Sequence, residues 1–137
     1  MLEKLDQEAE RTMTTANFET DFRLSLTLFA TPDLERLHGA LAEGHVLSGL
    51  YKLGGKRCLF GWLAGWKSRR ECLTHDYPSK QHFLAVRRTI RAFDRGLLPQ
   101  PVIAHILGAV LGERAEMNRR EEETRQGVLS RLSKQLV

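Results

Sequence analysis

The chain is 137 residues long, 42% of them hydrophobic and 28% charged, with 4 prolines and 11 glycines. This length and composition predict one globular domain and exclude a disordered chain, a collagenous chain and an assembly of separate cofactor and substrate domains. The sequence contains no apolar run of membrane-spanning length, its two cysteines make no disulfide framework, and its charged start differs from a secretory signal. We therefore expect a cytoplasmic protein that does not enter a membrane.

Charge is distributed unevenly along the chain. The formal net charge is +4, but residues 1–21 carry −4 and residues 52–95 carry +8. We expect an anionic partner to bind the middle of the chain, because that segment creates most of the positive field.

A short arm and a helical domain are expected over the first 112 residues. Residues 1–14 alternate charged and small polar residues, which predicts an acidic flexible arm, and residues 15–112 are the single domain. One helix is expected after Asn17, whose side chain can cap it, and another from Thr31 to about Glu43. The predicted fold class is mainly α: a compact helical domain with one short β-hairpin.

The β-hairpin is expected at residues 45–64, where the apolar periodicity changes. Gly54-Gly55 separates two apolar runs of similar length, which is typical of a two-residue hairpin turn. The residue pairs expected across the strands are Tyr51 with Cys58, Gly49 with Phe60, and Leu47 with Trp62. The cationic residues around the turn, which should form an exposed tip, are Lys52, Lys56 and Arg57.

A helix with two distinct faces is expected at residues 79–97. The apolar residues that fall within one arc of this helix are Phe83, Val86, Ile90, Phe93 and Leu97. The cationic residues that gather in a second arc are Lys80, Arg87, Arg88, Arg91 and Arg95. One face should pack on the core, and the other should meet phosphate or carboxylate groups, which the arginine fork binds bidentately.

Two further helical segments are expected after the last prolines. Residues 102–112 carry a wide apolar stripe and should be core. Residues 113–137 are a charged helix with several i,i+4 ion pairs and an amphipathic tail. The residues of a broken heptad in this tail are Met117, Thr124, Val128 and Leu132, so a self-assembling protein, with a homodimer through the C-terminal helix, is one alternative.

The sequence offers little support for phosphate-loop or metal chemistry. Residues 49–57 depart from a phosphate-binding loop, because Leu50 and Arg57 occupy positions that require glycine and Ser or Thr. The soft ligands that lack the paired short spacings of a zinc site are Cys58, Cys72, His75 and His82. We expect neither a cofactor nor a metal.

A thiol-dependent enzyme is a further alternative. Its centre would be Cys72 with His75, three residues apart on a helical turn, oriented by Asp76. A cysteine enzyme normally takes its histidine from a distant segment, so the residues favour a protein without catalytic activity.

Binding without catalysis is the function that the residues favour most. The cationic helix face, the hairpin tip and the segment between them form one expected surface for a nucleic acid or an acidic protein. The residues expected to contact this partner are Lys52, Lys56, Arg57, Trp66, Lys67, Arg69, Arg70, Lys80, Arg87, Arg88, Arg91 and Arg95. A competing interpretation is that the basic face only keeps its helix in water, with the acidic segment 1–21 folded back onto it.

Overall fold

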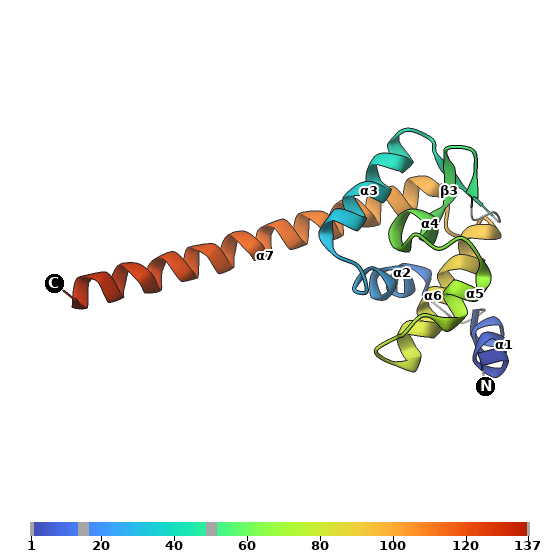
Figure 1. Ribbon diagram of the computed structural model, residues 1–137, viewed down its shortest axis with the longest axis horizontal. Coiled ribbons are helices and arrows are strands. Elements are labelled where there is room, and N and C mark those ends of the chain that lie inside the picture. Colours follow the sequence, from blue (N-terminus) through green and yellow to red (C-terminus); the bar gives the residue numbers. More distant parts are fainter. Residues whose placement is uncertain (1, 14–16, 49–51, 137) are drawn as a thin grey trace.

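The computed structural model describes residues 2–13, 17–48 and 52–136. This part of the chain is mainly α-helical with a small three-stranded sheet, which confirms the expected fold class (Figure 1). The helices are α1 (Leu2–Thr12), α2 (Phe18–Leu26), α3 (Thr31–Ala42), α4 (Leu59–Ala64), α5 (Arg69–Thr74), α6 (Lys80–Asp94) and α7 (Gln100–Gln135). The strands are β1 (Val46–Leu47), β2 (Lys52–Leu53) and β3 (Lys56–Cys58).

Local signals in the sequence delimit α2 and α3. The side-chain oxygen of Asn17 accepts a hydrogen bond from the backbone N–H of Thr20 (3.2 Å), as expected for the N-cap of α2. Pro32 lies in the first turn of α3, and Gly44 follows that helix with a φ of 72°, a conformation that favours glycine. The expected positions of both helices are confirmed.

The hairpin forms around Gly54-Gly55 with the expected register. β3 lies between β1 and β2, and it pairs with β2 in antiparallel orientation. The paired residues are Lys52 with Arg57 and Leu53 with Lys56. The pair expected between Tyr51 and Cys58 lies outside the described residues, and the strand pair expected between Gly49 and Phe60 is wrong, because Phe60 lies in α4.

The strand expected over residues 59–64 is wrong, because these residues form α4. The Sγ of Cys58 caps this helix by accepting a hydrogen bond from the N–H of Gly61 (3.3 Å). Leu47 therefore does not face Trp62; it lies beside Cys58 in a parallel pairing of β1 with β3. An apolar run this short does not distinguish a buried strand from a buried helix.

One hydrophobic core joins α2, α3, α4, α6 and α7. Its largest fully buried apolar side chains are Phe22, Leu26, Leu34, Leu37, Leu59, Phe60, Leu63, Val86, Ile103, Ile106 and Leu107. Within the core, α6 packs against α2, and its other side is covered by α1. This arrangement leaves α6 little free surface.

The N-terminal segment is a helix and not the expected flexible arm. α1 packs along α6, where Ala9 is fully buried beside Phe83 and Leu84. Met13, just after this helix, is also buried. The segment has few apolar residues because much of its contact with α6 is made by its acidic side chains.

α6 ends at Asp94, before the expected boundary at residue 97. Gly96 has a φ of 75° and turns the chain, so that Leu98 is 3% exposed and Leu97 is 55% exposed. The expected burial of Leu97 is therefore wrong, and Leu98 fills the core instead.

α7 is one uninterrupted helix where two segments were expected. Its 36 residues span about 54 Å. The first turns pack on the domain through Ile103, Ile106 and Leu107, and the orange and red part projects away from it (Figure 1). No helix of the described residues combines the length and the apolar character needed to cross a membrane.

Candidate functional site

Asp6 of α1 is the centre of a charge cluster between α1, α5 and α6. Its Oδ1 accepts a hydrogen bond from Nε of Arg87 (2.6 Å), and its Oδ2 pairs with Nη2 of Arg91 (3.0 Å) and with Arg69. Asp6 and Arg87 are both buried. Three guanidinium groups therefore share one buried carboxylate.

The contacts of α1 with the arginines lower the pKa of Asp6 and Glu10. Burial raises the pKa of a carboxyl group, but the hydrogen bonds and charges of Arg87 and Arg91 outweigh this effect and lower the pKa of Asp6. The pKa of Glu10 is lowered chiefly by its hydrogen bond from Arg95, with a further contribution from Arg91. Both carboxylates are therefore charged at neutral pH and hold α1 on α6.

A second charged pair joins α6 to α2. Nε and Nη2 of Arg88 donate to the two carboxylate oxygens of Asp21, at 3.1 and 3.0 Å, which is a bidentate geometry. Nη1 of Arg88 donates to Oγ1 of Thr12 (2.8 Å) and so connects the same guanidinium to α1. At the start of α6, Nζ of Lys80 lies 2.9 Å from the Glu8 carboxylate.

The whole cationic face expected on α6 is thus bound to acids of α1 and α2. The residues of this face are Lys80, Arg87, Arg88, Arg91 and Arg95. The structure brings them together at an internal interface, with the acidic segment folded back as in the competing interpretation. The acidic segment 1–21 was named from the sequence as a possible cover of this face through its −4 charge, but the individual acids that pair with each cation were not.

The cationic hairpin tip is separate from this interface. Lys56 is exposed at the turn, and the guanidinium of Arg57 lies over the ring of Trp62, 5.3 Å from its centroid. Lys52 lies in β2 opposite Arg57, and its side chain is outside the described structure. The tip therefore offers cations that are not bound in the α1–α6 cluster.

The segment between the hairpin and α6 contains one buried and several exposed residues of the expected surface. Trp66 is 6% exposed and stacks on Phe60 with 5.3 Å between ring centroids, so it lies in the core and not on the exposed surface where it was expected. Lys67, Arg69 and Arg70 are exposed. Of these three, Arg69 is held by Asp6.

A small hollow lies beside the Asp6 cluster. It is lined by Arg69, Arg87, Ile90, Arg91 and Asp94. Nε of Arg91 is buried and has no hydrogen-bond partner among the described residues, although both Nη atoms of this guanidinium are bound to acids. The wall of the hollow is therefore predominantly cationic.

Cys72 does not pair with His75 in the way that a thiol-dependent centre requires. Its Sγ is fully buried, 3.5 Å from the hydroxyl of Tyr77 and 3.7 Å from Nη1 of Arg87. The His75 ring is exposed and packs between the rings of Trp66 and Tyr77. The described contacts of the thiol are therefore with tyrosine and arginine, where substrate does not reach it.

The projecting part of α7 carries a row of exposed apolar side chains. Every residue from 117 to 136 is exposed. The large apolar residues among them, with their exposed fractions, are Met117 (61%), Val128 (40%), Leu129 (58%), Leu132 (50%) and Leu136 (88%). This density of exposed leucine on one helix end is typical of an interaction surface.

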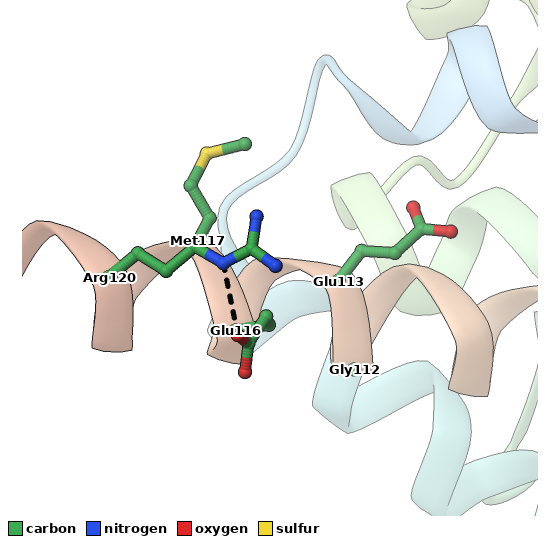
Figure 2. Close-up of a pocket in the computed structure, with 5 residues that line it drawn as sticks. All are labelled: Gly112, Glu113, Glu116, Met117 and Arg120. Atoms are coloured by element: carbon green, nitrogen blue, oxygen red, sulfur yellow. Dashed lines mark hydrogen bonds and ion pairs between the residues drawn. The ribbon is translucent and has the colours of Figure 1, made fainter.

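A shallow hollow opens where α7 leaves the domain. Figure 2 shows the residues that line it, all from α7: Gly112, Glu113, Glu116, Met117 and Arg120. Nε of Arg120 donates to Oε1 of Glu116 (3.0 Å) along the helix surface. Because one helix supplies all five residues, the hollow is an open surface that suits a macromolecule better than a small ligand.

No protein-family model, curated protein or solved structure is detectably similar to this chain. Among the described residues, no three His, Cys, Asp or Glu side chains are placed to hold a metal ion. The features of the molecule that bear on its function are therefore the α1–α6 charge cluster, the hairpin tip and the projecting part of α7.

Proposed function

We propose that the protein is a non-enzymatic interaction protein that self-assembles through the projecting part of α7. The main support for this proposal is the stripe of exposed apolar side chains at the end of this helix. Val128, Leu132 and Leu136 are four residues apart and, together with Leu129, fall within about 100° of the helix circumference. An amphipathic helix of this kind gains most of its stability by packing its apolar face on another surface.

The two halves of the projecting helix differ in how they are stabilised. Ion pairs within the first half join Glu116, Arg119, Arg120, Glu122, Glu123 and Arg125. Beyond Gln126 the described residues make no side-chain ion pair, and Gly127, Ser130 and Ser133 disfavour an isolated helix. The second half is therefore the part that needs a partner surface.

Analytical ultracentrifugation of the full chain over a range of concentrations tests this function. We expect the average mass to rise from monomer towards dimer as the concentration increases. The Leu129→Ser/Leu132→Ser variant should stay monomeric with an unchanged thermal unfolding of the domain. Leu97→Ser removes a similarly exposed leucine from the domain and should assemble like the wild type. A monomeric wild type at every concentration would contradict the proposal.

Binding of an anionic partner is a second candidate function. Five cations of α5 and α6, together with Arg95 just after α6, meet four carboxylates of α1 and α2, which leaves a surplus of positive charge within these contacts. The exposed Lys67 and Arg70 add to it. A nucleic acid or an acidic protein would be attracted to this side of the molecule.

Titration with duplex DNA, single-stranded DNA and RNA at two salt concentrations tests the second candidate. Binding should weaken steeply with salt, because each neutralised phosphate releases condensed counterions. Lys67→Glu/Arg70→Glu should weaken it at low salt, whereas Lys134→Glu, far away on α7, should not. Failure to bind any of the three at low salt would exclude nucleic acids, and a titration with polyglutamate would then decide on an acidic protein.

A further inference from the structure

We infer that α7 pairs with α7 of a second copy of this chain in antiparallel orientation. The pairing rests on the proposed assembly through α7, and it specifies the orientation and the register of the two helices. It follows from the spacing of residues along the projecting helix and from the charges at its centre.

One row of residues runs along α7 with alternating steps of four and three. A row with this spacing forms the seam of a two-helix coiled coil, because it stays on the side that faces the other helix. The seam residues are Leu111, Ala115, Asn118, Glu122, Arg125, Leu129, Leu132 and Leu136. Leu111 is half-buried on the core, and all seam residues after it are exposed. The seam therefore covers the part of the helix that leaves the domain.

In an antiparallel pair, two of the three leucines at the end of the seam face apolar residues of the second helix, and the third faces Asn118. With the twofold axis between residues 123 and 124, the leucines at the end of one helix meet the start of the seam in the other. The facing residues are Leu136 with Leu111, Leu132 with Ala115, Leu129 with Asn118, and Arg125 with Glu122. The large leucine opposite a small alanine allows the helices to approach closely, and each a position faces a d position, as knobs-into-holes packing requires.

The charges at the centre of the seam distinguish the two orientations. Glu122 and Arg125 form an ion pair within each helix. In an antiparallel pair each Arg125 also faces Glu122 of the second copy, so four groups of alternating charge surround the twofold axis. In a parallel pair Glu122 would face Glu122 and Arg125 would face Arg125, and like charges opposite each other oppose association.

The positions of the two domains agree with the antiparallel orientation. The domains would lie at opposite ends of the helix pair, separated by about 37 Å of helix between seam residues 111 and 136. The end of each helix would reach the domain of the second copy beside Leu111, where a partly buried apolar side chain is available.

Cysteine cross-linking in the full chain tests the orientation. The background is Cys58→Ser, in which Oγ takes over the cap of α4, and the remaining native cysteine is buried. Ala115→Cys mixed with Leu132→Cys should give mixed disulfide dimers on oxidation. Ala115→Cys alone should not, because its two copies lie about 25 Å apart. Met117→Cys mixed with Ser130→Cys, at the same height but off the seam, is the matched control and should cross-link far less.

Charge reversal tests the register. Glu122→Arg should raise the dimer dissociation constant by about tenfold, because it places two arginines opposite each other on both sides of the axis. Adding Arg125→Glu to it should restore the wild-type value. Glu123→Arg also breaks an ion pair within the helix, with Arg119, but lies off the seam and should leave dimerisation unchanged. In a dimer whose interface does not contain residue 122, Glu122→Arg would weaken association no more than Glu123→Arg does.

A full chain that stays monomeric would contradict both the proposed function and the pairing. A dimer in which Ala115→Cys cross-links with itself, or whose dissociation constant is insensitive to Glu122→Arg, would overturn the antiparallel pairing alone and leave assembly through α7 in place.

Discussion

Asp6 is the single side chain on which the attachment of α1 depends most. It neutralises the buried guanidinium of Arg87 and also contacts Arg69 and Arg91. A buried ion pair contributes modestly relative to apolar packing, but removal of one partner leaves the other charge without compensation. The loss is therefore much larger than for an ion pair in water.

Asp6→Asn should lower the free energy of unfolding by about 3 kcal/mol, because Arg87 then remains charged and buried without its counterion. Urea denaturation monitored by circular dichroism measures this difference. Glu8→Gln is the matched control, since its partner Lys80 is half-exposed and the expected loss is below about 1 kcal/mol. Equal losses in the two variants would show that the burial of Asp6 carries no additional stability.

Acid should weaken the same interface. The pKa of Asp6 is lower in the folded protein than the value of about 3.9 in an unfolded chain, so its ionised form stabilises the fold at neutral pH. This stabilisation is complete above the unfolded pKa and is lost as the pH falls through the folded pKa. Urea denaturation at a series of acidic pH values gives the free energy of unfolding as a function of pH. As the pH falls, this free energy should decrease more steeply for the wild type than for Asp6→Asn. The same pH dependence in both proteins would contradict the stabilising role of ionised Asp6.

Among the elements, those with local signals were predictable. Asn17 caps α2, Pro32 lies in the first turn of α3, and Gly54-Gly55 sets the register of the hairpin, because each of these residues acts on its own few neighbours. The position of the arginines of α6 on one side of the helix was also predicted correctly, since helical periodicity alone places them there.

The elements that depend on distant contacts were not predictable. α1 was expected to be flexible because a segment rich in acidic residues is usually exposed to solvent. Only the folded structure places Asp6 against arginines of α5 and α6. Trp66 was expected on the binding surface because it lies among cations, yet it packs on Phe60 in the core. For the candidate site, the charges and the alternative that residues 1–21 fold back on them were therefore predictable, whereas the individual pairs, such as Asp6 with Arg87, were not.

Gly127 is the weakest helix former in the projecting part of α7. It is exposed, and a Cβ at this position would meet nothing within 4 Å. Gly127→Ala should stabilise the local helix by up to about 1 kcal/mol and so increase the helical circular dichroism signal. Gly54→Ala is the opposite control, because its φ of 60° strains any residue with a Cβ, and it should destabilise the protein. An unchanged helical signal in Gly127→Ala would contradict the expectation.

At the scale of the whole molecule, the charge pattern is largely self-complementary. The acidic N-terminal segment neutralises much of α6, which leaves the hairpin tip and part of α5 as cationic surface. The same contacts close the domain around its core. The projecting part of α7 (Figure 1) then carries most of the large exposed apolar residues of the described chain.

Amide hydrogen exchange of the full chain at low and at high protein concentration tests assembly through α7 most directly. The amides of residues 127–136 should exchange rapidly in the dilute sample and become protected in the concentrated one, because packing on a second copy stabilises this end of the helix. The amides of α1 and α6 should exchange at the same rates in both samples. Rapid exchange of residues 127–136 at both concentrations would contradict the account.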